Sequence, residues 1–117
     1  MQTILVAEDE SALRKMLTDI LRKEGYHVLA AGSGQDAISA SQRHSGTLDL
    51  LITAIVMSGM GGADLYAWLK TERPDLKVLF ISGLMSREPL EGSFLKKPFT
   101  RSELAEKVRE ILPAEAA

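Results

Sequence analysis

The centre of the chain reads Asp49-Leu-Leu-Ile-Thr-Ala-Ile-Val-Met-Ser-Gly-Met-Gly-Gly62, and this stretch decides the fold. Its apolar run, Leu48–Ile52, is interrupted only by Asp49 and shows no regular alternation of apolar and polar residues, and residues 55–57 continue it up to a glycine-rich breaker. Strands without alternation are buried on both faces, as in parallel sheets whose helical crossovers cover each face. The stretch therefore predicts a central strand of a parallel sheet, followed by a turn.

The same succession of a short apolar run and a helical pattern recurs on both sides of this stretch. Further apolar runs lie at Ile4–Ala7, Tyr26–Leu29, Val78–Ile81 and Phe94–Lys96, and helical spacing recurs at 13–21, 37–40, 65–69 and 104–112. Gly25 stands where a helix C-cap glycine is expected, and Thr100 and Glu103 have the spacing of a capping box. Residues 83–93 predict at most a short helix. The pattern is that of a doubly wound α/β fold with five parallel strands, (βα)₅.

Composition narrows the class of protein. The chain has 117 residues, of which 45% are hydrophobic and 26% charged, so we expect a single domain over residues 1–117. It has no cysteine, which excludes disulfides, thiolate zinc sites and cysteine nucleophiles. A net charge of −2 gives no support for direct nucleic-acid binding. No apolar run approaches the ~20 residues of a membrane span, and no signal peptide is visible, so we expect a cytoplasmic protein without direct membrane contact.

In doubly wound sheets the functional groups lie just beyond the carboxyl ends of the strands. Glu8 and Asp9 follow the first strand directly. They could hold a hard cation such as Mg²⁺, which prefers carboxylate oxygens. They could equally be an acidic helix start, which the helix macrodipole favours.

Two further polar side chains follow later strands. Ser82 places a hydroxyl after the fourth strand, and Lys97 follows the fifth and precedes Pro98. Each of them alone is an ordinary turn serine or surface lysine. A lysine facing an acidic pocket, however, could neutralise it and also bind an anion, so we expect the Lys97 ammonium near the carboxylates of Glu8 and Asp9.

Together, the acidic pair, Ser82 and Lys97-Pro98 resemble the receiver domain of two-component response regulators, in the style of receivers attached to hybrid sensor kinases. The resemblance extends over Thr3–Leu112 and is densest in the central stretch and in two segments nearer the C-terminus, Arg73–Gly83 and Phe94–Thr100. It implies a flavodoxin-like fold with strand order 2-1-3-4-5. It also implies a sensor histidine kinase, a phosphotransfer domain or an output protein as the partner.

The resemblance assigns a role to each matching position. Glu8 and Asp9 are implied to be metal-binding acids, with the backbone carbonyl of Val56 as a further ligand. Ser82 is implied to contact the phosphoryl group.

Three more positions carry implied roles in switching. Lys97 is implied to pair with the phosphoryl group, ahead of a cis peptide bond to Pro98. Phe94 occupies the aromatic switch position. The first helix is implied to contact the phosphotransfer partner, through basic residues expected to be exposed: Arg14, Lys15, Arg22 and Lys23.

The sequence departs from the family pattern at the phosphoacceptor position, where Ala54 replaces aspartate. A methyl group can neither attack a phosphohistidine nor complete a metal site, so we expect at most weak Mg²⁺ binding. Thr53 points to the opposite face of its strand, and Asp49 lies roughly 16 Å away along it. Ser58 stands where the family usually has proline, and an alcohol is a weak nucleophile without a base.

These observations predict a receiver that is not an enzyme and acts by protein–protein interaction, with aspartyl phosphorylation disabled. An alternative is a normal phosphorelay receiver into which alanine has been engineered at position 54. A distant alternative is a flavodoxin-like cofactor-binding protein, but Glu8 and Asp9 would repel a bound phosphate. The short segment 83–93 makes the usual output face around the fourth helix doubtful.

Overall fold

The computed structural model describes residues 1–83 and 91–114 of the chain. The elements are β1 (Thr3–Ala7), α1 (Ser11–Lys23), β2 (His27–Ala31), α2 (Gly34–Arg43), β3 (Leu50–Ala54), α3 (Gly62–Glu72), β4 (Lys77–Ser82), β5 (Ser93–Lys96) and α4 (Arg101–Ile111). The strands form one five-stranded parallel sheet in the order β2-β1-β3-β4-β5, so the predicted doubly wound fold is confirmed. The short helix expected within 83–93 falls mainly on residues 84–90, which lie outside the described part.

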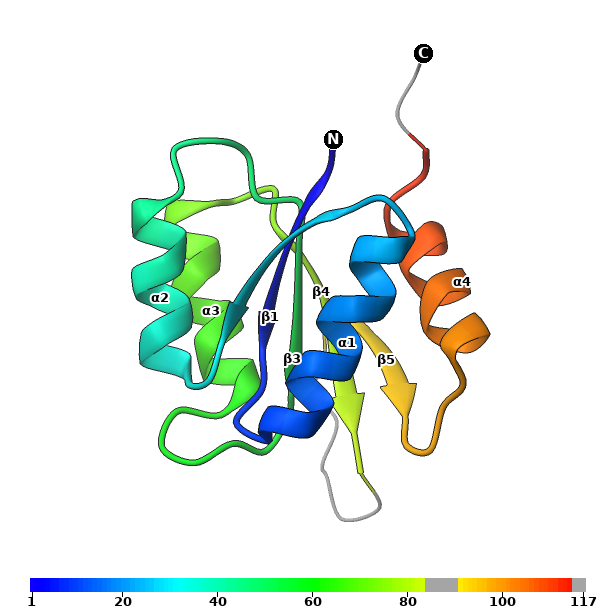
Figure 1. Cartoon of the computed structure of the whole chain (residues 1–117). Helices are drawn as coiled ribbons and strands as arrows, with labels where there is room; N and C mark the ends of the chain where they lie inside the picture. Colours follow the sequence, from blue (N-terminus) through cyan, green and yellow to red (C-terminus); the bar gives the residue numbers. More distant parts are fainter. Residues whose placement is uncertain (84–90, 115–117) are drawn as a thin grey trace.

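Helices cover both faces of the sheet (Figure 1). One core cluster packs alternate residues of β1, such as Ile4 and Val6, with side chains of α1 and α4. The other packs the intervening residues, Leu5 and Ala7, with side chains of α2 and α3. This division explains why the central strands are apolar without alternation, since both of their faces are buried.

Two strands are displaced from the limits expected from the sequence. The apolar run predicted a strand from Leu48, but β3 begins at Leu50, and it pairs with β1 over Leu50–Thr53 and with β4 over Leu50–Ala54. Beyond it the chain turns, so Val56 is 70% exposed although it belongs to an apolar run. The second strand was expected to include Tyr26, but the Tyr26 amide donates to the Leu21 carbonyl at the end of α1, and β2 begins one residue later.

The helix ends follow the local sequence. Gly25 has a φ of 96° and its amide donates to the Arg22 carbonyl, which with the Tyr26 bond forms a Schellman motif. The capping box is also confirmed, because Thr100 Oγ1 accepts from the Glu103 amide while the Glu103 carboxylate accepts from the Thr100 amide. Among the described residues, no helix has the length and apolar character needed to cross a membrane.

Candidate functional site

The carboxyl ends of four neighbouring strands bring the predicted site residues to one edge of the sheet. Glu8 follows β1, Ala54 ends β3, Ser82 ends β4 and Lys97 follows β5. The strand register holds these ends level with one another, and the Lys97 amide donates to the Ser82 carbonyl at 2.9 Å. The structure therefore brings these residues together at the edge where the sequence predicted them.

Glu8 is a carboxylic acid in an almost fully buried place, with 3% of its surface exposed. Its Oε2 accepts from the Glu10 amide at 3.0 Å, whereas Oε1 has no hydrogen-bond partner among the described residues. Burial raises the pKa of Glu8 above its ordinary value, and the Glu10 amide and the charge of Lys97 offset this only in part. Burial of the ionised form is costly without a paired charge, so the proton is retained to higher pH than in water.

Asp9 has a different environment from its neighbour, because it is exposed. Its Oδ2 accepts from the Ser58 amide at 2.9 Å. That hydrogen bond, followed by the contact with Glu8, lowers the pKa of Asp9 below its ordinary value. Sequence reasoning missed this partner. The sequence did contain a signal for it, because Ser58 has a backbone N–H at a position where the family pattern has proline, and proline has no N–H to donate.

Ser82 and Ala54 line the middle of the edge. Ser82 is 2% exposed, and its Oγ is a second buried polar atom without a hydrogen-bond partner in the described part of the chain. Buried hydroxyls are normally hydrogen-bonded, so each exception calls for an explanation. The side chain of Ala54, at the end of the neighbouring strand β3, offers neither a donor nor an acceptor. Within the described residues, this edge therefore holds two buried oxygen atoms without a hydrogen-bond partner, one from the Ser82 hydroxyl and one from the Glu8 carboxyl group.

Lys97 contributes a positive charge to this edge. The predicted cis peptide bond between Lys97 and Pro98 is confirmed. Lys97 lies near enough to lower the pKa of Glu8, yet within residues 1–83 and 91–114 it forms no ion pair with Glu8 or Asp9. The Lys97 ammonium therefore attracts the Glu8 carboxylate, but its nitrogen lies more than 4.0 Å from the carboxylate oxygens of Glu8 and Asp9.

Phe94, on β5, and Val56, just after β3, differ in their burial. The Phe94 ring is half-buried and stacks on Phe80, with 5.7 Å between the ring centroids and 25° between the planes. Val56 lies on the exposed loop after β3. The structure thus keeps Phe94 against the core.

The residues at this edge fit a magnesium site only in part. Mg²⁺ requires near-octahedral oxygen coordination. In the part of the chain that the structure describes, Glu8 has one carboxylate oxygen without a partner, one oxygen of Asp9 is already hydrogen-bonded, and the side chain of Ala54 provides no oxygen. Among the described residues, no group of three or more acidic, histidine or cysteine side chains is gathered for a metal. The donor set is too small for a tight site.

The predicted exposed basic face of α1 needs one correction. Arg14 is not free, because its Nη1 donates to the Glu8 carbonyl at 2.7 Å and the side chain is half-buried. Lys15, Arg22 and Lys23 are exposed, as expected, although Arg22 also donates to the Val28 carbonyl. Arg14 therefore supports the loop that carries the acidic pair, a long-range role that helical spacing does not reveal.

An open groove lies between α1 and the loop after β5. It has a volume of about 320 Å³ and is lined by Glu10, Leu13, Met16, Lys97, Pro98 and Phe99. Met16 is 41% exposed within it, an unusual place for a large apolar side chain. The groove shares Lys97 with the candidate site, so a partner in the groove would contact both.

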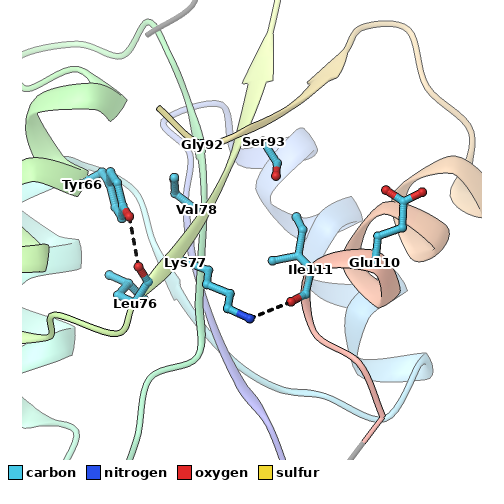
Figure 2. Close-up of a pocket in the computed structure, with 8 residues that line it drawn as sticks. All are labelled: Tyr66, Leu76, Lys77, Val78, Gly92, Ser93, Glu110 and Ile111. Carbon is cyan, nitrogen blue, oxygen red and sulfur yellow. Dashed lines mark hydrogen bonds between the residues drawn. The ribbon is translucent and has the colours of Figure 1, made fainter. Parts of the chain in front are cut away.

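A second hollow, of about 480 Å³, lies at the opposite, amino-terminal end of β4 and β5 (Figure 2). Two of its polar side chains are committed to the backbone, since Tyr66 Oη donates to the Leu76 carbonyl and Lys77 Nζ to the Ile111 carbonyl. None of the predicted site residues lines it.

Comparison with known proteins decides the family. The sequence model of the response regulator receiver domain matches residues 4–109. The chain belongs to this family. Receiver domains are signalling modules of two-component systems, so the resemblance noted from the strand-end residues is confirmed at the level of the family.

Two curated relatives illustrate where such receivers occur. The sensor kinase CckA of Brucella abortus (strain 2308) is 34% identical over 117 residues, which are 94% of this receiver and 12% of CckA. The response regulator receiver protein CpdR of the same strain is 35% identical over 121 residues, covering 97% of this receiver and 99% of CpdR. Related receivers therefore occur both as one part of a long kinase and as nearly the whole of a protein.

Solved structures agree with this assignment. The receiver domain of the hybrid histidine kinase CckA has a TM-score of 0.83 at 34% identity, covering 94% of this receiver and 98% of that chain. The response regulator TrrA of Thermotoga maritima, solved in complex with Mg²⁺-BeF, also has a TM-score of 0.83 at 31% identity, covering 96% and 100% of the two chains. A relative of this fold thus binds Mg²⁺.

Proposed function

We propose that this receiver acts in two-component signalling as a protein-interaction module whose state does not depend on aspartyl phosphorylation. The observation that carries the proposal is Ala54, which ends β3 between Glu8 and Ser82 at the edge where the family pattern places its phosphoacceptor. Phosphoryl transfer to a carboxylate requires an oxygen lone pair that attacks phosphorus, and a methyl group has none.

Neighbouring side chains are poorly suited to replace the missing nucleophile. Thr53 is buried, and its hydroxyl donates to the Ala54 carbonyl at 3.2 Å. Asp49 lies at the other end of β3, where its carboxylate accepts from the Thr3 amide at 2.8 Å. Neither group can reach a phosphoryl donor at the carboxyl edge, which supports loss of phosphorylation rather than its transfer to a neighbour.

In this proposal the remaining site residues keep the chemistry of the family in part. Ser82 and Lys97 could still contact an oxyanion, through a hydroxyl and an ammonium. Glu8 and Asp9, with the Val56 carbonyl, would bind Mg²⁺ only weakly, because the ion lacks a carboxylate from position 54. Phe94 would hold its place against Phe80 without a phosphoryl group to select its rotamer.

The partner in this proposal is a sensor histidine kinase, a phosphotransfer domain or an output protein. The groove between α1 and the loop after β5 supports such an interaction, since it combines exposed apolar surface at Met16 with the ammonium of Lys97. Lys15 and Lys23 add positive charge on exposed positions of the same helix. Charges of this kind steer association more than they add affinity.

The test is the intact mass of the purified chain after incubation with acetyl phosphate and Mg²⁺. We expect no adduct on the chain as it stands. We expect Ala54→Asp to gain ~80 Da, one phosphoryl group on the restored nucleophile. A phosphoryl adduct on the unaltered chain would contradict the proposal.

The same variant addresses the origin of Ala54. If alanine was introduced into an ordinary receiver, Ala54→Asp should be phosphorylated completely. If the site has drifted around a natural alanine, the new carboxylate should recover metal affinity but little phosphoryl transfer. Ala54→Asn is the matched control, because it has nearly the same volume but no carboxylate nucleophile.

A further inference from the structure

The loop between β3 and α3 is held at both of its ends by contacts within the described structure. The Gly62 amide donates to the Ile55 carbonyl at 3.0 Å, which closes the loop on itself. Met57 is buried, and the Thr53 hydroxyl lies 3.7 Å from its sulfur. The intervening Ser58 is exposed and makes the contact that links this loop to another part of the chain.

That contact joins two loops at the functional edge. The Ser58 amide donates to Asp9 Oδ2 at 2.9 Å, across 49 positions of sequence. Hydrogen bonds to an ionised acceptor are about twice as strong as neutral ones. The bond also accounts for the lowered pKa of Asp9, since it stabilises the carboxylate form.

We propose that the Ser58 amide takes the place of a divalent cation at Asp9, and so holds the loop after β3 in one arrangement without a metal. This inference rests on the proposed function, because a receiver that is not phosphorylated does not need the cation for phosphoryl transfer. A cation that bound Asp9 through Oδ2 would compete with the amide for that oxygen. The hydrogen bond therefore disfavours the cation, in addition to the missing ligand at position 54.

The site as a whole is consistent with this competition. The neighbouring acid, Glu8, is buried, and its Oε2 accepts from the Glu10 amide. Asp9 is exposed, and its Oδ2 accepts from the Ser58 amide. Each acid of the pair thus accepts from a backbone N–H, and within residues 1–83 and 91–114 neither forms an ion pair with Lys97.

Two substitutions at position 58 separate the amide from the hydroxyl. Ser58→Pro removes the N–H, whereas Ser58→Ala keeps it and removes only the hydroxyl. Both are made in the Ala54→Asp background, where the third carboxylate brings Mg²⁺ affinity into the range of calorimetry. We expect Ser58→Pro to bind Mg²⁺ about tenfold more tightly than Ser58→Ala. The proline variant lacks the hydrogen bond to the charged Asp9 carboxylate, and a difference of this size corresponds to one such bond. Equal affinities in the two variants would overturn the inference.

A second measurement covers the case in which the proline variant does not fold. Solvent exchange of the Ser58 amide proton is followed by NMR in the unaltered chain and in Asp9→Ala. We expect exchange roughly fivefold faster in Asp9→Ala, since the acceptor is lost. The Gly62 amide, which bonds to Ile55 instead, is the internal control and should not change. Equal Ser58 exchange in both chains would overturn the inference.

The two proposals fail in distinguishable ways. Phosphorylation of the unaltered chain would contradict the proposed function, and the intact mass of the chain would detect it. The comparison of Ser58→Pro with Ser58→Ala is read by Mg²⁺ affinity, and the exchange of the Ser58 amide needs neither metal nor phosphoryl donor.

Discussion

Gly62, the first residue of α3, passes so close to the end of β3 that no side chain can be placed there. A Cβ atom would overlap the Ala54 carbonyl oxygen and lie 2.9 Å from Thr53 Cγ2. Backbone atoms cannot move aside as the tip of a flexible side chain can. The glycine is therefore required by the close approach of helix and strand that positions the loop carrying Ser58.

We expect Gly62→Ala to lower the free energy of unfolding by about 2–3 kcal/mol, the usual cost of forcing atoms into a packed site. Gly59→Ala is the control, because its φ of 76° is strained for alanine but nothing lies within 4 Å of the new Cβ. We expect Gly59→Ala to lower the free energy of unfolding by about 1 kcal/mol. Urea denaturation measures both, and equal losses would show that the close contact is relieved elsewhere.

At the scale of elements, Arg73 joins the end of α3 to the end of α2. Its guanidinium donates to Ser41 Oγ at 2.8 Å and to the carbonyls of Ser41, His44 and Gly46 at 2.9, 2.8 and 3.0 Å. The last carbonyls of a helix have no partner within it, so they must be satisfied from outside. One planar side chain does this for α2 and for the turn that follows.

We expect Arg73→Lys to lower the free energy of unfolding by about 1–2 kcal/mol, although the charge is kept. An ammonium cannot reproduce the planar arrangement of donors, so some of these carbonyls lose their partner. Arg43→Lys, at an exposed position in the last turn of α2, is the matched control and should change stability by less than about 0.5 kcal/mol. Equal effects of the two substitutions in urea denaturation would contradict this account of α2.

At the scale of the whole molecule, Glu8 makes global stability depend on pH. Burial raises the pKa of Glu8 above its ordinary value of 4.5 in the folded chain. Between that value and the raised one, the folded state keeps a proton that the unfolded state has released. The free energy of unfolding therefore falls as pH rises through this interval. Asp9 acts in the opposite sense, because its lowered pKa costs stability only as pH falls below its ordinary value of 3.8.

We expect Glu8→Gln to remove the first of these effects. The variant should be more stable than the unaltered chain at pH 7. At that pH the unaltered chain loses free energy of unfolding, because Glu8 must either be buried as a charged group or keep a proton that the unfolded chain releases. The difference should shrink towards pH 4, where the carboxyl is protonated in both states. Urea denaturation at the two pH values measures this. A stability difference that is the same at both would show that Glu8 does not titrate in this interval.

The sequence alone determined those features that depend on local pattern. Apolar runs without alternation, such as Leu48–Ile52, require burial on both faces, and that requirement specifies a parallel sheet with helices on each side. The cap at Gly25 and the capping box at Thr100 depend on residues within one turn of each other. The placement of Glu8 and Ser82 at one edge follows from the sheet, because parallel strands all end on the same side.

The tertiary structure decided what depends on residues far apart in the chain. The Ser58 amide meets Asp9 across 49 positions, and no periodicity encodes that pairing. Helical spacing placed Arg14 on an exposed face, but the folded loop offers it the Glu8 carbonyl. The length of β3 was likewise set by where its neighbours could pair with it, and Val56 became exposed as a result. Local patterns specify which face of an element is buried. Only packing specifies which polar group each element meets at its ends.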